Sequence, residues 1–138
     1  MKLNPYLNFG DKTEEAFEFY KTVFGNEFAF FQRFKDAPGT EEGDAEKVMH
    51  VALPIGNDTL MGSDSPASMM STFKIGNNIS LSLQPDSKEQ ADELFSKLSE
   101  GGVVLMPLAD QFWNAYFGML TDKYGVNWMI NYAYPQGD

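Results

Sequence analysis

His50 is the residue of this chain best suited to proton transfer near neutral pH, and it is the only histidine in the sequence. An imidazole can serve as a general acid, a general base or a metal ligand. A single histidine is more often a hydrogen-bonded structural residue than a catalytic one. An enzyme built on His50 would need carboxylates to complete a metal site, and Asp64 and Asp110 are the candidates.

The sequence contains no cysteine, which excludes disulfides, thiolate zinc sites and cysteine nucleophiles. It also lacks the G-x-S-x-G pattern of a nucleophile elbow and a glycine-rich phosphate loop. The N-terminus does not resemble a signal peptide, and no run of eighteen apolar residues could span a membrane. We therefore expect a cytoplasmic protein without a membrane partner.

The charge balance limits the possible partners. Acidic residues number 20 against 10 basic ones, so the formal net charge is −10. Nucleic acids and anionic membrane surfaces are bound by clustered Lys and Arg, and neither is expected as a partner. A neutral or cationic small molecule is compatible with this charge, and 43% hydrophobic residues suffice for a packed core.

The periodicity of apolar residues predicts one order of elements twice. Helices are predicted after Asp11, with Glu14 at capping-box spacing and Gly25 at the end, and after Ser87, with Gln90 at the same spacing and Gly101 at the end. Alternation of apolar and polar residues predicts the strands. They cover residues 3–9, 27–34, 47–55 and 58–64 in the first half, and 78–84, 102–108, 112–121 and 126–132 in the second.

This order predicts an α+β fold of two βαβββ modules within a single domain of residues 1–138. The first module covers residues 1–64 and the second covers residues 77–134. Each module would carry its helix on one face of a mixed sheet and leave the other face open. Two such sheets can cover each other's open faces or form a cup between them.

Alternation also predicts which side chains occupy the open faces. His50 falls with Val48 and Ala52, opposite an apolar set that should meet the helix. A mixture of aromatic, methionine, hydroxyl and amide groups suits a small organic ligand, although such side chains could also fill the cup as a second core. The predicted ligand-binding residues are Asn4, Tyr6, Asn8, His50, Met61, Ser80, Ser82 and Met129, with Trp113 and Tyr116 at the rim.

Several local strings resemble the vicinal oxygen chelate superfamily, the glyoxalase, bleomycin resistance and dioxygenase fold. Within it the chain resembles the PhnB-like branch, catalogued under a 3-demethylubiquinone methyltransferase heading. The most specific string is the last of the four, because the pattern FW…YG…TD.(F/Y)G..W is typical of the branch, and here its YG element appears as Tyr116-Phe117-Gly118. The strings are PYLNFGDKTEEAFEFYKTVFG, MHVALPIGNDTLMGSD, ISLSLQPDSKEQADELF and QFWNAYFGMLTDKYGVNWMIN.

The resemblance implies where a metal would be bound in the metal-dependent relatives, which use His, Glu or Gln. The corresponding positions fall near Asn4, Met61, Asn78 and Met129. Thioethers and amides are poor ligands for hard or borderline divalent ions, so we expect no metal of that kind. We also expect no methyltransferase cofactor, because a glycine-rich turn between a strand and a helix is missing.

Three hypotheses follow from these observations. The first is metal-free binding of a small organic molecule, with the acidic charge favouring a cationic ligand. The second is a metal-dependent enzyme of glyoxalase or dioxygenase type that uses His50. The third is a module that mediates dimerisation without a ligand, and the resemblance implies a homodimer in any of the three cases.

Overall fold

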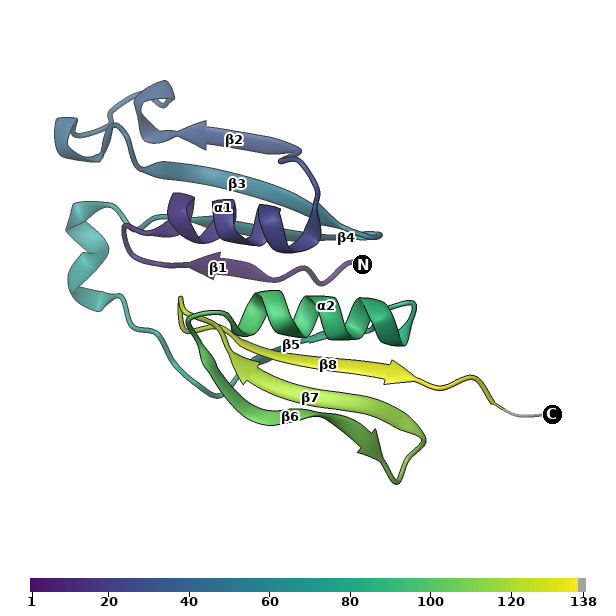
Figure 1. Cartoon of the computed structure of the whole chain (residues 1–138). Coiled ribbons are helices and arrows are strands. Elements are labelled where there is room, and N and C mark those ends of the chain that lie inside the picture. The colour runs from purple at the N-terminus through teal and green to yellow at the C-terminus, as the bar shows by residue number, and fades with distance from the viewer. Residues whose placement is uncertain (137–138) are drawn as a thin grey trace. The chain divides into compact units, whose positions relative to one another are not determined.

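The structure is a computed structural model, and it describes residues 1–136 of the chain. The chain folds as two compact units, of which the first comprises residues 1–75 and the second begins at Gly76. Each unit contains one α-helix and one four-stranded mixed sheet (Figure 1). The predicted order of elements, strand, helix and three strands, is confirmed in both units.

In the first unit, strand β1 runs parallel to β4, while β3 is antiparallel to both β4 and β2. The strand order across the sheet is β1-β4-β3-β2. Short 3-10 turns occupy the acidic loop and the connector after β4. The elements are β1 (Tyr6–Asn8), α1 (Thr13–Phe24), β2 (Phe30–Arg33), η1 (Phe34–Asp36), η2 (Glu42–Asp44), β3 (Val48–Ile55), β4 (Asp58–Ser63) and η3 (Ala67–Thr72).

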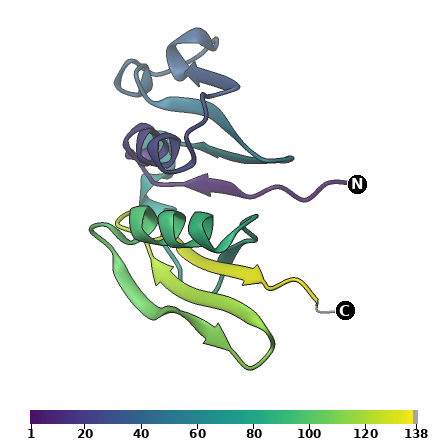
Figure 2. The same ribbon diagram turned by 45° about the vertical axis from the view of Figure 1, so that its right-hand side comes forward.

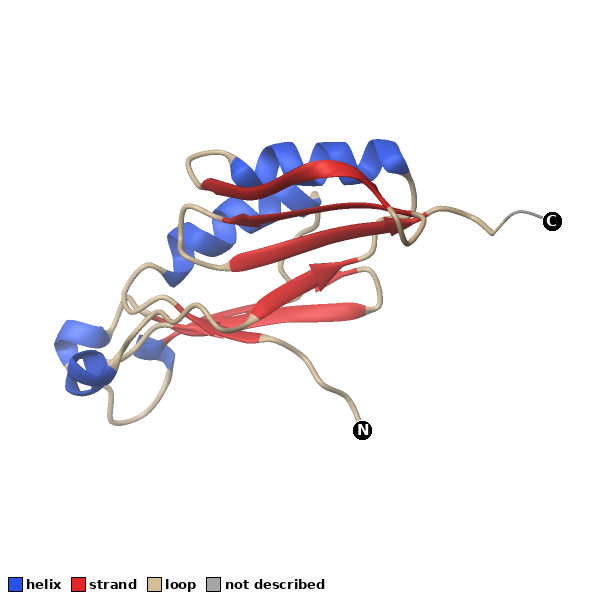
Figure 3. Cartoon of the chain, turned by 90° about the horizontal axis from the view of Figure 1, so that it is seen from below, coloured by secondary structure: helices blue, strands red, loops and turns tan. Residues whose placement is uncertain are grey.

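The second unit repeats this topology. Its strand order is β5-β8-β7-β6, with β5 parallel to β8 and the other two pairs antiparallel. In Figures 2 and 3 each helix lies along one face of the sheet of its own unit. The elements are β5 (Ser80–Leu83), α2 (Lys88–Ser99), β6 (Val103–Gln111), β7 (Ala115–Thr121) and β8 (Asn127–Ala133).

The two helices begin in different ways. Ser87 is the N-cap of α2, and its hydroxyl accepts from the backbone N–H of Gln90 at 3.0 Å, as the spacing predicts. The predicted capping role of Asp11 is wrong, because Lys12 occupies the N-cap of α1. The N–H of Thr13 instead donates to Asp64 at 2.9 Å, so the residue that caps α1 comes from the end of β4.

Two features of the first sheet differ from simple alternation. A strand was predicted from residue 3, but β1 begins only at Tyr6, and Leu3 is 97% exposed. The pairing of β2 with β3 shifts between Gln32 and Arg33, and Val48 is fully buried. The prediction that Val48 shares the open face with His50 is therefore wrong, because a β-bulge interrupts the period of two.

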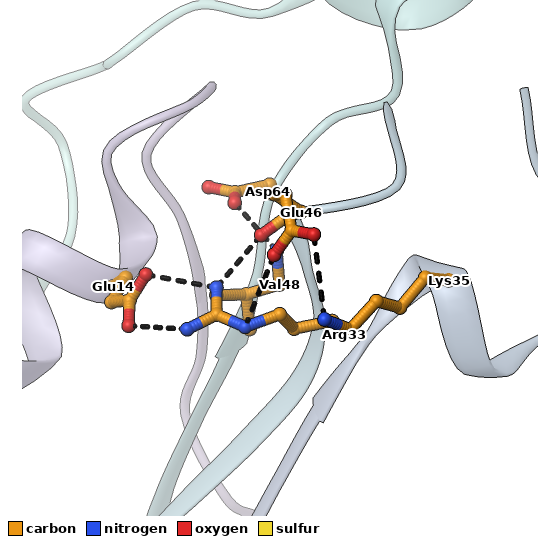
Figure 4. A network of polar contacts seen from close by, with 6 residues as sticks. All are labelled: Glu14, Arg33, Lys35, Glu46, Val48 and Asp64. Carbon is orange, nitrogen blue, oxygen red and sulfur yellow. Dashed lines mark hydrogen bonds and ion pairs between the residues drawn. The ribbon is translucent and has the colours of Figure 1, made fainter. Parts of the chain in front are cut away.

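An ion pair joins α1 to the edge strand β2. The Arg33 guanidinium donates to both carboxylate oxygens of Glu14, at 2.9 and 2.7 Å, and to the backbone carbonyl of Glu46 (Figure 4). These hydrogen bonds and the guanidinium charge lower the pKa of Glu14. A carboxyl whose pKa is lowered by folding stabilises the fold above its unfolded pKa, and this contribution fades as the pH falls through the lowered value.

Within residues 1–136, no helix is both long enough and apolar enough to cross a membrane.

Candidate functional site

The open face of the first sheet is identified by what faces α1. A Cβ atom built on Gly62 would lie 2.7 Å from the Phe17 ring of α1, so Gly62 faces the helix. Its neighbour Met61 therefore points to the other face. Met61 pairs with Tyr6 on one side and with Ala52 on the other, and Ala52 pairs with Phe30. These pairings form one row of side chains across all four strands.

His50 lies beside this row and contacts two of its aromatic rings. The Tyr6 hydroxyl and His50 Nδ1 are 3.1 Å apart, and the two rings stack with centroids separated by 5.6 Å. The Phe30 ring is 5.4 Å from the imidazole. When the tyrosine hydroxyl donates to Nδ1, the neutral imidazole carries its proton on Nε2 and can donate it to a ligand. The prediction that Tyr6 and His50 share a face is confirmed.

This aromatic cluster of Tyr6, Phe30 and His50 is accessible to solvent. Tyr6 is 50% exposed and Phe30 is 47% exposed, although both lie in hydrogen-bonded strands. Sequence reasoning missed Phe30, because its strand was predicted without assigning its faces. The register pairs Phe30 with Ala52, and Ala52 had been placed on the open face, so the pairing supplies the missing assignment.

The two asparagines predicted for this face have different surroundings. The Asn8 side chain is hydrogen-bonded within the protein. Its carboxamide oxygen accepts from the N–H of Gly10 at 2.8 Å and from the Ser65 hydroxyl at 3.0 Å. These bonds close the turn that leads into α1. Asn4 precedes the first residue of β1 and is half-buried. A ligand-binding role therefore fits Tyr6 and His50 better than Asn8.

Asp64, the nearest candidate carboxylate in sequence for a site with His50, is 5% exposed and serves the fold. One oxygen accepts from Thr13 N–H, and the other accepts from Val48 N–H at 2.8 Å (Figure 4). Thr13 Oγ1 donates in turn to the carbonyl of Ser63, so the start of α1 is fastened to the end of β4. Both carboxylate oxygens accept buried backbone hydrogen bonds, so the observed role of Asp64 is to satisfy the start of α1 and the start of β3.

The open face of the second sheet is lined by methionine. Leu120 and Ile130 are fully buried on the helix-bearing face. Because successive side chains of a strand point to opposite faces, the adjacent residues Met119 and Met129 lie on the open face. Met119 pairs with Met129 on one side and with Met106 on the other, and Met129 pairs with Ser82. Ser82 and Met129 were predicted for this face, whereas Met106 and Met119 were not.

Ser80 and Trp113 were also predicted for the second sheet, and the structure places them at different positions. Ser80 pairs with Asn127 at the start of β5 and is exposed. Trp113 occupies the turn between β6 and β7, where its indole N–H donates to Asn131 at 3.4 Å and its ring meets Phe117 edge-on at 5.6 Å. Asn131 and Phe117 pair with each other on the methionine-bearing face, so Trp113 lies at the end of that face.

Tyr116 is placed differently from its prediction. Its hydroxyl donates to Asp92 of α2 at 2.5 Å. Tyr116 lies four residues before Leu120 in the same strand, so the two side chains share the helix-bearing face. The hydrogen bond to Asp92 raises the pKa of Tyr116 to about 12. The rim position on the open face is therefore wrong for this residue. Alternation counted from Met119 would have placed it correctly.

In the part of the chain that the structure describes, metal ligands of the usual kinds do not gather in either unit. Within residues 1–136, His, Asp and Glu side chains form no group of three that could hold a metal ion. Of the four positions that correspond to metal ligands in relatives, Met61 and Met129 lie on open faces. Asn4 and Asn78 lie just before the strands β1 and β5.

Solved structures of the glyoxalase/bleomycin resistance/dioxygenase class share this fold. A member from Burkholderia phytofirmans superposes with a TM-score of 0.63 at 19% identity, covering 94% of this chain and 97% of that chain. A glyoxalase-related enzyme from Fulvimarina pelagi gives a TM-score of 0.64 at 14% identity, covering 99% and 94%. The two βαβββ units therefore define a glyoxalase-fold protein.

The chain belongs to the family described as 3-demethylubiquinone-9 3-methyltransferase, whose model matches residues 1–131, and to its PhnB-like branch. It is 38% identical to protein PA1353 of Pseudomonas aeruginosa, with a TM-score of 0.83 and coverage of 96% and 98%. A PhnB protein from Bacillus cereus is 30% identical, with a TM-score of 0.78 and coverage of 96% and 100%. Protein YjdN of Escherichia coli is 28% identical over 99% of this chain and 98% of its own.

Proposed function

We propose that this protein binds a small organic molecule, without a metal ion, on the open face of the first sheet. The observation that carries the proposal is the cluster of Tyr6, Phe30 and His50. The Tyr6 and Phe30 ring centroids lie 5.6 and 5.4 Å from the centroid of the His50 imidazole, and both of these aromatic residues are about half exposed. Exposed aromatic side chains beside one polar donor are typical of sites that hold a flat organic ligand by shape and a few hydrogen bonds.

The ligand of this proposal is neutral or cationic. The row across the sheet contains Tyr6, Met61, Ala52 and Phe30, none of which carries a fixed charge. Aromatic faces attract cations, and the net charge of −10 gives the protein a negative electrostatic potential that also attracts cations. We place this binding protein in the cytoplasm, since a chain without cysteine suits a reducing compartment.

A thermal-shift screen with neutral and cationic aromatic metabolites tests the proposal. We expect at least one compound to raise the melting temperature of the wild-type protein, because a ligand at 100 times its Kd adds about 2.7 kcal/mol of stability. The shift should be lost in Tyr6→Ala and His50→Ala. It should persist in Phe112→Ala, which removes an aromatic side chain that is 96% exposed outside the cluster.

Two results would contradict this proposal. One is a shift of equal size in the wild type, Tyr6→Ala and His50→Ala, which would place the ligand elsewhere. The other is tight, stoichiometric binding of Ni²⁺, Zn²⁺ or Mn²⁺ that disappears in His50→Ala. That second result would favour the metal-dependent enzyme that uses His50.

The apolar edge of the second sheet supports a homodimer as a further part of this proposal. Strand β6 is an edge strand in which Val103 is 60% exposed and Leu105 is 55% exposed. Pro107 and two register shifts interrupt its ladder, which disfavours pairing through the main chain. Apolar side chains of the strand, rather than its backbone, would then contact the second copy.

Light scattering during size-exclusion chromatography tests this contact. We expect the wild type to elute as a dimer and Leu105→Lys to shift it toward the monomer, because a charge would be buried in the interface. The matched variant Met69→Lys alters a methionine that is 56% exposed in the first unit and should leave the dimer unchanged. A monomeric wild type, or a Leu105→Lys dimer as stable as the wild type, would contradict the proposed contact.

A further inference from the structure

Three methionines lie side by side on the open face of the second sheet. Met106 of β6 pairs with Met119 of β7, and Met119 pairs with Met129 of β8. Directly paired residues in a sheet place their Cβ atoms about 5 Å apart on the same face. We refer to Met106, Met119 and Met129 as the methionine row.

A β-bulge brings Met106 into this row. Val104 pairs with Leu120, a fully buried residue on the helix-bearing face, so a regular strand would place residue 106 on that face as well. The register shifts between Val104 and Met106, and the extra residue turns Met106 toward Met119. A second shift, between Met106 and Ala109, follows directly. Bulges of this kind re-aim a side chain, and they recur beside functional sites.

A glycine permits the close approach of the bulged strand. A Cβ atom built on Gly118 would lie 2.9 Å from the backbone nitrogen of Leu108 and 3.0 Å from the carbonyl oxygen of Met106. A side chain at this position would force the strand β6 or the helix α2 to shift. The absence of a side chain at Gly118 therefore allows the backbone at Met106 to approach β7.

We propose that the methionine row binds a soft monovalent cation of the Cu(I) type through its thioether sulfurs. Thioethers are neutral, polarizable ligands that select Cu(I) over hard or borderline divalent ions. Met129 pairs on its other side with Ser82, so the row across the sheet offers three sulfurs and one hydroxyl, without a carboxylate or an imidazole. This donor set discriminates against Mg²⁺, Ca²⁺ and Zn²⁺ by its chemistry.

The row is accessible enough for an ion to enter. Met106 is 40% exposed, and Met119 and Met129 are both half-buried. Partial burial lowers the number of rotamers that each methionine must give up on binding, which favours a preformed set of ligands. This site differs in sheet, residues and ligand chemistry from the organic-ligand site proposed above. A negative result for one proposal therefore does not contradict the other.

Titration with Ag⁺, a soft monovalent cation that resists oxidation in air, tests the site in chloride-free buffer. The full chain is labelled with ¹³C at its methionine methyl groups, and the sequence contains eight methionines. We expect the methyl signals of the methionine row to shift together and to saturate at one Ag⁺ per chain. The signals of Met61 and Met69 should stay in place. Competition with a Cu(I) chelator under anaerobic conditions should then show Cu(I) binding at the same stoichiometry.

Variants separate a site from general thioether affinity. Met119→Leu removes the central ligand in a volume-conserving substitution, and we expect it to weaken Ag⁺ binding at least tenfold. Met61→Leu changes a methionine on the open face of the first sheet and should bind as the wild type does. Shifts of all exposed methionines in parallel, or undiminished binding by a folded Met119→Leu, would overturn the proposal.

Discussion

Replacing Asp122 with alanine is expected to lower the free energy of unfolding by about 4 kcal/mol. Asp122 is 3% exposed and follows β7 directly. Its carboxylate accepts from the N–H groups of Tyr124 at 2.8 Å and Val126 at 3.1 Å, and from the indole N–H of Trp128 at 2.8 Å. Alanine would leave these donors without their acceptor, and each buried donor left unsatisfied costs about 1–3 kcal/mol.

Chemical denaturation monitored by tryptophan fluorescence measures this loss. Asp122→Asn retains one acceptor oxygen and should fall between the wild type and Asp122→Ala. The matched control is Asp11→Ala, which removes an exposed carboxylate and should change the free energy of unfolding by less than about 0.5 kcal/mol. If Asp122→Ala proved as mild as this control, the carboxylate would not be the group that holds the turn together.

This result would also explain the most specific string that the chain shares with its family. The string TDKYGVNW covers the turn from β7 into β8, where Gly125 has φ +92° and Asp122 collects the hydrogen bonds. Trp128 is 1% exposed on the helix-bearing side of the sheet. We therefore interpret this string as a structural element that fixes the turn and the core.

Gly118→Ala is expected to destabilise the second unit by about 3 kcal/mol. The added Cβ would approach Phe95 Cε2 at 2.8 Å in addition to the backbone atoms of Met106 and Leu108. Two of these three neighbours are backbone atoms that cannot rotate away, so the strand β6 or the helix α2 must shift. Overpacking of this kind typically costs about 1–3 kcal/mol.

The same denaturation experiment measures the Gly118→Ala effect. Gly43→Ala provides the matched control, because a Cβ there meets nothing within 4 Å. A displaced β6 should also move the methyl signal of Met106 more than that of Met129, which belongs to the far side of the row. A Gly118→Ala protein of wild-type stability would show that β6 relaxes without cost, and it would weaken the case that this bulge holds Met106 in place.

The fold was predictable because its signals are local. The helical period of the apolar residues, the left-handed Gly25 at φ +72° and the cap at Ser87 are each encoded within a few residues. The alternation of strand residues likewise predicts that Tyr6 and His50 share a face, and their hydrogen bond confirms it. The element order repeated in both halves predicts two βαβββ modules, and the resemblance of four strings to the vicinal oxygen chelate superfamily implies the glyoxalase fold.

The candidate site was predictable only in part, because several of its features depend on partners distant in sequence. Asp64 was a candidate only as a carboxylate that an enzyme built on His50 would need, and its hydrogen bonds to Thr13 and Val48 come from other elements of the fold. Tyr116 was predicted at the rim of the cup, and its hydrogen bond to Asp92 of α2 shows that it faces the helix. Such assignments need the fold, because the decisive donor or acceptor belongs to another element.

The sequence by itself determined the order of elements, the absence of thiol chemistry and the placement of Tyr6, Met61 and Met129 on open faces. Only the tertiary structure decided which of those side chains meet. Strand register brings Phe30 to His50, and a bulge turns Met106 toward Met119. The physical reason is that the period of two is local to each strand, whereas register and bulges arise from hydrogen bonding between strands.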